Sequence, residues 1–423
     1  MSWEKVKLGE CIDVISGFAF KTKDFCNSGV PIIKIKNVNP PYVSLEDLTY
    51  IPVDLANKIP KYELLYDDIL IAMTGSHINQ WASVVGRVAK VKYRARSMLN
   101  QRVGKIILKE NAKANLDYIY YFLTRDEVKI ELAAKAGGAA NQANISPTDI
   151  KNLEIPFPPL KTQNKIADIL SAYDDLIENN QKQIKLLEEA AQRLYKQWFI
   201  DLRYPGHETT PIVNGLPKGW RKESVKDCLE MHIGGGWGKD NPDGKNTFAG
   251  KVIRGTDIND VKQGNFNDVP TRYHTANDMQ KRKLAEYDIV FELSNGNINN
   301  IGRSLFVNQL LLENCGENTI CASFCKLLRS KNKYLAMLLY LEIQDMQNSG
   351  RMLPYKKHGS NGINNFDFEG FLNHEFLIPS NKNILAPFFD IMKKIANIQK
   401  SFSLLIESRD RLLPKLMNCE LEI

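Results

Sequence analysis

The most regular feature of the sequence is a spacing of apolar positions by alternating steps of four and three residues. It runs from Ile166 to Trp198 and recurs from Ile384 to Leu416, 218 residues later at every position. Such a 3.5-residue repeat is typical of a coiled-coil seam, and two copies predict two helices that pack on each other. The predicted seam residues are Ile166, Leu170, Tyr173, Ile177, Asn180, Ile184, Leu187, Leu194 and Trp198 in the first helix, and Phe388, Ile391, Ile395, Ile398, Phe402, Leu405, Arg409, Leu412 and Leu416 in the second.

Each seam contains a polar residue, Asn180 in the first helix and Arg409 in the second. Buried polar residues in a seam weaken packing but fix register and orientation. The linker at 203–219 is too short to return along such a helix, so a folded unit must lie between the two helices. We therefore expect antiparallel helices, and about 36 helical residues would form a rod of roughly 54 Å.

The rest of the chain also contains an internal sequence repeat. "WEKVKLGECIDVISG" from Trp3 returns loosely as "WRKESVKDCLEMHIGGG", "YDDILIAMTGS" from Tyr66 returns as "YDIVFELSNG", and "VGRVAKV" returns as "IGRSLFV". The matching segments lie 216 to 223 residues apart and follow the same order, which indicates two diverged copies of one unit. In each copy, short strands between Gly, Asn and Pro turns precede a helical stretch, a Gly-rich loop, a short strand and the long helix.

These patterns predict an α+β fold with two mixed α/β domains, two long antiparallel coiled-coil helices that separate them, and an internal pseudo-two-fold repeat. The predicted boundaries are 1–158 for the first domain, 159–202 for the first spacer helix, 203–219 for the linker, 220–382 for the second domain, and 383–423 for the second spacer helix with a C-terminal tail.

Composition agrees with a globular protein, at 43% hydrophobic and 25% charged residues. No apolar run reaches the ~18–20 residues of a membrane span, and the first residues lack the apolar core of a signal peptide, so we expect a cytoplasmic protein. Seven scattered cysteines favour reduced, packed thiols. Their one cluster, "CGENTICASFC", lacks a CxxC pair and a nearby His, so no metal site is predicted.

The formal net charge of +7 is unevenly distributed. Between Ser76 and Lys109 there is no Asp or Glu, which favours a polyanionic partner such as nucleic acid. The alternative is a cationic strand face that is balanced elsewhere in the fold. The basic residues of this stretch are Arg87, Lys90, Lys92, Arg94, Arg96, Arg102, Lys105 and Lys109.

A rigid spacer with a similar module at each end suits recognition of a two-part DNA site, because major grooves on one face of B-DNA recur about every 34 Å. The loops of the two copies differ, so the two half-sites should differ as well. Those loops are rich in side chains that distinguish base edges, although Asn and Gly also favour turns. The predicted DNA-binding residues are Lys34, Lys36, Ser76, His77, Asn79, Gln80, Arg94, Arg96, Arg102, Gln142, Asn144, Trp237, Lys239, Arg254, Asn295, Asn297, Asn299, Lys356, Lys357, His358, Ser360 and Asn361.

Three stretches carry a resemblance to a known family: "NISPTDIKNLEIPFPPLKTQNKIADIL", "LLEEAAQRLYKQWFIDLRYPGHE" followed by "GLPKGW", and the ending "RDRLLPKLMNCELEI". Over essentially its whole length the chain resembles the specificity subunit of type I restriction–modification enzymes. The resemblance implies that each domain reads one half of a split, asymmetric double-stranded DNA site. It also implies that the helices recruit two modification (methyltransferase) subunits and, through them, ATP-dependent restriction subunits.

In this family S-adenosylmethionine is expected on the methyltransferase subunit, so the resemblance implies no cofactor on this chain. The sequence departs from the family pattern in two places. "FLIPSNKNILAPFFD" lacks the Gln and double-Pro signature of the first copy, and Cys419 stands where the family commonly has Gly.

The segment "NVNPPYVSL" offers an alternative function. Its Asn39-Pro40-Pro41-Tyr42 resembles the motif with which amino-methyltransferases grip and stack on a flipped adenine. The 38 preceding residues contain no strand running into a Gly-rich turn that could bind the cofactor. The second copy has Asn259-Asp260-Val261-Lys262 at this place, without proline or aromatic residue. We read Asn37 and Val38 as a strand end that Pro40-Pro41 terminates.

HExxH, GxSxG and P-loop motifs are also missing from the sequence. The favoured hypothesis is therefore a non-catalytic DNA-specificity subunit with no catalytic residues of its own. A self-sufficient adenine-N6 DNA methyltransferase is the alternative. A third hypothesis, an architectural coiled-coil protein, predicts DNA binding without sequence preference.

Overall fold

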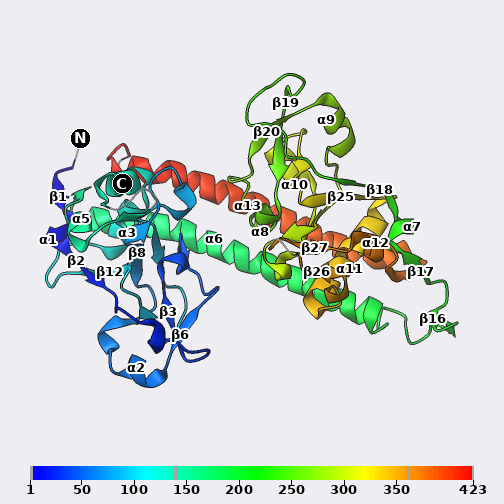
Figure 1. The fold of residues 1–423 in the computed structure, drawn as a ribbon, viewed down its shortest axis with the longest axis horizontal. Coiled ribbons are helices and arrows are strands. Elements are labelled where there is room, and N and C mark those ends of the chain that lie inside the picture. Colours follow the sequence, from blue (N-terminus) through cyan, green and yellow to red (C-terminus); the bar gives the residue numbers. More distant parts are fainter. Residues whose placement is uncertain (1–2, 138–141, 360–361, 422–423) are drawn as a thin grey trace. The chain divides into compact units, whose positions relative to one another are not determined.

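The computed structural model describes residues 3–137, 142–359 and 362–421. The chain folds into two compact units (Figure 1). The first comprises Met1–Asp174 with Glu407–Ile423, and the second comprises Asp175–Ile406. Each unit therefore contains one β-rich domain and a part of both long helices.

The first unit is built on a six-stranded and a four-stranded sheet. The six-stranded sheet has the order β2 (Ile12–Ser16), β12 (Val103–Leu108), β8 (Ile69–Ala72), β10 (Val88–Lys90), β5 (Tyr42–Val43), β4 (Val38–Asn39). The four-stranded sheet has the order β6 (Thr49–Ile51), β3 (Val30–Ile33), β11 (Ser97–Leu99), β7 (Glu63–Leu64). Two further ribbons pair β1 (Lys5–Lys7) with β14 (Glu154–Pro156), and β9 (Thr74–Gly75) with β13 (Ala143–Asn144).

The second unit repeats this strand order. Its four-stranded sheet runs β18 (Leu229–Gly234), β25 (Cys325–Ser330), β21 (Ile289–Glu292), β23 (Ser304–Phe306), which corresponds to β2, β12, β8, β10. Its other sheets are β20 (Thr271–His274), β19 (Phe248–Ile253), β24 (Ile320–Cys321); β17 (Arg221–Ser224) with β28 (Glu375–Ile378); β22 (Ser294–Asn295), β27 (Asn364–Phe366), β26 (Lys356–Lys357); and β15 (Ile212–Val213) with β16 (Leu216–Pro217). The predicted α+β fold with an internal repeat is confirmed.

The helical stretch of the first copy differs from expectation. It forms two helices, α3 (Leu116–Thr124) and α4 (Asp126–Lys135), because Arg125 between them adopts an extended conformation with φ −64° and ψ 142°. The second copy has one helix there, α11 (Lys333–Ser349). The shorter helices are α1 (Leu8–Cys11), α2 (Val53–Asn57), α5 (Pro147–Lys151), α7 (Val225–Cys228), α8 (Ile258–Lys262), α9 (Ala276–Arg282), α10 (Gln309–Cys315) and α12 (Phe368–Leu372).

The two long helices are α6 (Leu160–Tyr195), which continues into a π-helical turn at Lys196–Ile200, and α13 (Ala386–Met417), drawn in red in Figure 1. Within the second unit Asn180 contacts Ser401 and Trp198 contacts Phe388, so the helices run antiparallel. All of the predicted seam side chains are buried or half-buried. None of the helices in the described ranges is both long and apolar enough to cross a lipid bilayer.

The hydrophobic cores lie where domain and long helices meet. In the first unit Tyr118 and Ile119 of α3 pack with Ile166 and Leu170 of α6 and with Leu416 of α13. In the second unit the helix ends contribute a stacked aromatic pair, Tyr195 and Phe199, to the core. Three of the clustered cysteines are core members as well: burial raises the pKa of Cys315 to about 11 and that of Cys321 to about 12, and Cys325 is fully buried.

One strand expectation was wrong in detail. Asn37 does not continue a strand but closes a 3₁₀ turn at Ile35–Asn37, where its Oδ1 accepts the backbone N–H of Lys34. Asp257 closes the equivalent turn in the second copy. Val38–Asn39 then forms its own short strand, β4, which turns at Pro40 and Pro41 and pairs with β5.

Candidate nucleic-acid interface

Several basic residues of the acid-free stretch are paired with acids from other parts of the first unit. Its ion pairs are Lys90–Asp117 at 2.8 Å, Lys92–Asp67 at 2.8 Å, Lys105–Asp68 at 2.6 Å and Arg96–Glu63 at 3.0 Å. For these side chains the alternative explanation applies, a cationic strand face balanced elsewhere in the fold. Arg94 and Arg102 of the predicted DNA-binding set remain exposed. The run of charge alone is therefore weak support for a nucleic-acid partner.

A polar cluster at one end of the first domain joins residues from three separate parts of the chain. Strands β9 and β13 bring Thr74 opposite Asn144, and the Thr74 hydroxyl donates to Asn144 Oδ1 at 2.7 Å. Arg102 Nη1 donates to the same oxygen at 3.3 Å. The exposed Arg102 guanidinium is thereby held beside the loop that contains the predicted residues Ser76 to Gln80.

The second unit has the same cluster with one difference. Strand β22 places Ser294 opposite Asn365, and the Ser294 hydroxyl donates to Asn365 Oδ1 at 2.7 Å. The place of Arg102 is taken by Phe324. In the first unit Met73 N donates to Arg102 O at 2.9 Å, and in the second Leu293 N donates to Phe324 O at 2.8 Å.

Phe324 and Asn365 were missed by the sequence analysis. Phe324 precedes strand β25 as Arg102 precedes β12, and its ring is 58% exposed, which is unusual for a residue of this size. Neither residue stands out in the sequence, because the equivalence appears only when the two sheets are aligned strand by strand.

Phe324 lies at a hollow of about 630 Å³ in the second unit. The rings of Trp237 and Phe324 and the side chain of Ile363 line it together with Asn295 and Arg254. Trp237 is 40% exposed, and the guanidinium of Arg272 lies 4.5 Å from its ring centroid. Such an arrangement holds the indole in place while leaving one part of it accessible.

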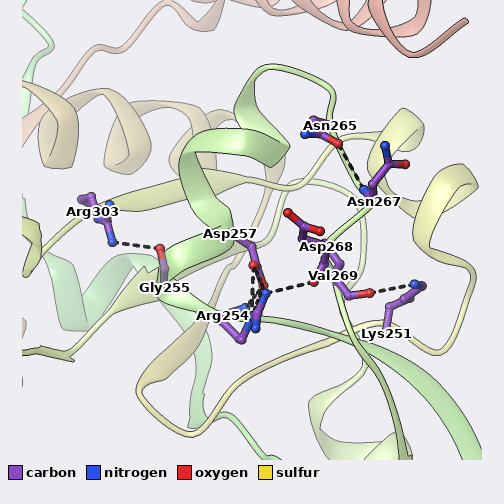
Figure 2. A network of polar contacts seen from close by, with 9 residues as sticks. All are labelled: Lys251, Arg254, Gly255, Asp257, Asn265, Asn267, Asp268, Val269 and Arg303. Carbon is purple, nitrogen blue, oxygen red and sulfur yellow. Dashed lines mark hydrogen bonds and ion pairs between the residues drawn. The ribbon is translucent and has the colours of Figure 1, made fainter. Parts of the chain in front are cut away.

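Arg254, a predicted DNA-binding residue, is committed to the fold of its own domain (Figure 2). Its Nε and Nη2 atoms donate to the Asp257 carboxylate at 2.9 Å and 2.6 Å, and Nη2 also donates to Asp268 O at 2.9 Å. The hydrogen bond with Asp257 raises the pKa of the guanidinium. This network secures the 3₁₀ turn at Gly255–Asp257.

The same turn is secured by an arginine in both copies. Arg303 Nη2 donates to Gly255 O at 2.9 Å (Figure 2), and Arg87 Nη2 donates to Ile35 O at 3.3 Å. The repeated "VGR" and "IGR" segments thus carry a repeated contact. Their arginines hold each domain together and are not placed as DNA contacts.

The asparagine-rich loop of the second unit is mainly a turn. Asn295 Nδ2 donates to Glu292 Oε1 at 2.7 Å, and its Oδ1 accepts the backbone N–H of Asn297 at 2.8 Å. Asn297 Oδ1 in turn accepts the N–H of Asn299 at 3.0 Å. Asparagine is favoured here because its side chain caps the backbone locally. The side chain of Asn299 is exposed.

The other predicted DNA-binding residues fall into two groups. Lys36, Asn79, Gln80, Gln142 and Lys239 are exposed. The remainder have partners within the fold or are half-buried. Ser76 is buried and forms hydrogen bonds with Gln80 O and Ser83, and His77 is half-buried. Lys34 lies over the Phe25 ring, Lys356 donates to Asn299 O, Lys357 forms an ion pair with Asp367, and His358 forms a hydrogen bond with Asn364. Ser360 and Asn361 lie outside the described residues. A DNA contact at any of these positions stays a prediction.

Comparison with known proteins gives a consistent result. The family model of the type I restriction modification DNA specificity domain matches residues 1–189. The MjaVIII specificity subunit of Methanocaldococcus jannaschii is 33% identical over 45% of this chain, and the match spans 44% of that protein. The MjaIX specificity subunit of the same organism is 26% identical over 77% of this chain and 73% of its own length. A crystal structure of the S subunit from M. genitalium shares the fold over 99% of this chain and 96% of that one, with a TM-score of 0.54 at 16% identity. Residues 1–189 thus carry a type I restriction–modification DNA specificity domain, and the chain as a whole is similar to specificity subunits of these enzymes.

This family is not catalytic, and the Asn39-Pro40-Pro41-Tyr42 segment is placed accordingly. The Pro41 carbonyl accepts the Lys90 N–H at 2.9 Å and the Tyr120 hydroxyl at 3.4 Å. Asn39 Oδ1 accepts from Arg87 Nη1 at 3.3 Å. The two groups that would have to grip an adenine amine are thus engaged within the specificity subunit's first domain.

Proposed function

We propose that each domain of this specificity subunit reads one half of a bipartite, asymmetric site in double-stranded DNA. One observation carries the proposal: the two units share strand order and backbone contacts, yet present different side chains at equivalent exposed positions, as at Arg102 and Phe324. A shared frame with different surface chemistry suits two related tasks with different targets. The similarity to specificity subunits supports the same conclusion.

We further propose that the long helices recruit two modification (methyltransferase) subunits. The relatives are specificity subunits of type I restriction enzymes, so a partner must supply the chemistry. S-adenosylmethionine would bind to that partner, and ATP-dependent restriction subunits would join through the complex. The helices still expose large apolar side chains, namely Leu176, Leu186 and Leu404, which supports an interaction there.

A domain exchange tests the proposal that each domain reads one half of the DNA site. The methylated motif is first mapped in host DNA with the chain present and with it deleted. Residues 1–158 are then replaced by the same segment of another family member. We expect one half of the motif to change while the other half and the spacing stay the same. An unchanged motif after the exchange would contradict the proposal.

The alternative function, a self-sufficient methyltransferase, has a separate test. The purified chain alone, incubated with S-adenosylmethionine and mixed-sequence DNA, should transfer no methyl groups. The Tyr42→Ala variant should leave modification by the reconstituted complex largely unchanged. Turnover by the isolated wild-type chain would instead favour the alternative.

A further inference from the structure

Arg102 and Phe324 occupy the same place in the two domains. Each directly precedes the strand that pairs with the first long strand of its unit, β2 or β18. Each also follows a backbone segment on which a glycine packs without room for a side chain: a Cβ on Gly17 would collide with the backbone of Leu99 and Asn100, and one on Gly235 with that of Cys321 and Ala322. The backbone is therefore constrained alike, and only the side chain differs.

In the first domain this place presents an oriented cation. Thr74 holds Asn144, and Asn144 accepts one N–H of the Arg102 guanidinium. Within the described ranges no carboxylate forms an ion pair with Arg102, in contrast to Arg96, Lys90, Lys92 and Lys105 of the same stretch. Arg102 is exposed, so the other N–H groups of its guanidinium are accessible to a ligand. A planar guanidinium matches the O6 and N7 acceptors of guanine.

In the second domain the same place presents an apolar ring. Phe324 has no donor for a base or a phosphate, although the hydroxyl–asparagine pair beside it is kept as Ser294 and Asn365. Its ring and Trp237 are exposed at the edge of the hollow. In the major groove the 5-methyl group of thymine is the apolar feature that such a surface distinguishes.

We propose that Arg102 and Phe324 are matched specificity-determining residues, with Arg102 reading a guanine edge in one half-site and Phe324 contacting a thymine methyl group in the other. This rests on the proposed function, since it assigns the chemistry of two readers to two named side chains. It also explains why one frame can serve an asymmetric site.

The guanine arm of the test uses the complex of this chain with its modification subunits and duplexes of the mapped motif. Each guanine of the first half-site is replaced in turn by 7-deazaguanine, which lacks the N7 acceptor. For the wild type we expect about a tenfold loss of affinity at one position, the size of a typical base contact. Arg102→Ala should bind the substituted and unsubstituted duplexes equally. Arg102→Lys keeps the positive charge but lacks the paired N–H donors of the guanidinium, so it should lose most of the preference for guanine over 7-deazaguanine. Lys113→Ala, the loss of another exposed cation of the first unit, is the control.

The thymine arm replaces each thymine of the second half-site by deoxyuridine, which removes only the methyl group. For the wild type we expect roughly a tenfold loss at one position, as for a methyl group in an apolar site. Phe324→Ala should not distinguish thymine from deoxyuridine, whereas Phe324→Leu should retain a preference. Ile212→Ala removes another exposed apolar side chain of the second unit and should behave as the wild type.

The outcomes separate this inference from the proposed function. If Arg102→Ala weakens binding to every sequence alike and lowers the salt dependence, Arg102 is a phosphate contact and the guanine assignment is overturned. If Phe324→Ala keeps the full thymine preference, the thymine assignment is overturned. In both cases the wild-type complex still prefers its motif. If the wild type itself does not distinguish the motif from a scrambled duplex, the proposed function fails as well.

Discussion

In each unit a tyrosine–carboxylate hydrogen bond joins α6 to the domain, but the tyrosine belongs to the domain in the first unit and to α6 in the second. In the first unit Tyr121 of α3, in the domain, donates to Asp174 Oδ2 of α6 at 2.7 Å. In the second, Tyr195 of α6 donates to Glu342 Oε2 of α11, in the domain, at 2.6 Å. A buried donor–acceptor pair is preserved at each junction although the residues are not.

The further donors to the two carboxylates differ in origin. Asp174 receives Arg409 Nη1 from α13 at 2.8 Å, so this cluster joins the domain and both long helices. Glu342 receives Arg351 Nη1 and His374 Nε2, each at 2.8 Å, from within its own domain. The positions of the second unit that match Asp174 and Arg409 are Met392 of α13 and Ala191 of α6, which line a hollow of about 550 Å³. We infer that the Asp174 cluster fixes the register of the two long helices, whereas the Glu342 cluster stabilises the second domain and its contact with α6.

Loss of the Glu342 carboxylate should have the largest effect. Glu342→Ala leaves the Tyr195 hydroxyl and the Arg351 guanidinium without their buried partner, and we expect the second unit to lose about 3–5 kcal/mol of stability. Native-state hydrogen exchange of the α11 and β28 amides measures this. Glu313→Ala, which removes an exposed carboxylate from the same unit, should change the opening free energy by less than about 0.5 kcal/mol. Equal effects of the two variants would argue against the cluster.

The Asp174–Arg409 pair can be converted into its apolar counterpart. Asp174→Asn removes the charge opposite a half-buried Arg409, and we expect a loss of about 2 kcal/mol in the first unit. Copying the second unit with Asp174→Met and Arg409→Ala together should recover much of this loss, because an apolar pair needs no desolvated charge. Exchange protection of the α3 amides reports both changes. A double variant that is less stable than the sum of the single variants would refute the equivalence.

The pH dependence of the second unit should reflect Glu342. Burial alone would raise the pKa of this carboxyl, but hydrogen bonds from His374, Arg351 and Tyr195 hold it below its ordinary value of 4.5. The folded form therefore binds its proton less readily than the unfolded chain, so this stabilisation is present above the ordinary value and is lost as pH falls through the folded pKa. Urea unfolding at pH 3 to 7 should show a smaller acid-induced decrease in stability for Glu342→Gln than for the wild type. Parallel curves would contradict this assignment.

The smallest effect is expected at Asn180. Its Nδ2 donates to Ser401 Oγ across 3.4 Å between partly exposed side chains, so little energy depends on the bond. Asn180→Ala should change the stability of the second unit by less than about 0.5 kcal/mol in the same exchange experiment. A loss near that of Asp174→Asn would show that both polar seam residues fix the register.

The sequence alone was sufficient for features that depend on periodicity. The heptad spacing predicted both long helices, and the repeated segments predicted two copies of one strand order. Periodicity is local, so it is visible without coordinates. The break at Arg125 was not predicted, because one extended residue leaves the helical pattern on either side unchanged.

Features that depend on long-range pairing could not be read in this way. The acids that neutralise Lys90 and Lys105 are Asp117 and Asp68, which lie outside the basic stretch and meet it only through the fold. Arg254 reads as a base contact in sequence, but Asp257 and Asp268 O hold it in place. Arg102 was predicted, whereas Phe324 was not, because an aromatic residue before a strand gives no sign that its ring is exposed.

The pairing of strand β1 with β14 and of strand β17 with β28 has a consequence for the evolution of the two domains. Lys5 lies opposite Pro156, and Arg221 lies opposite Ile378, so each domain enters and leaves through one narrow antiparallel ribbon. A segment with adjoining ends can be inserted, lost or replaced as a cassette with little disturbance to its surroundings. Recombination between genes at the codons of these ribbons would therefore combine one domain with a different second domain in one event, without a sequence of intermediate point mutations.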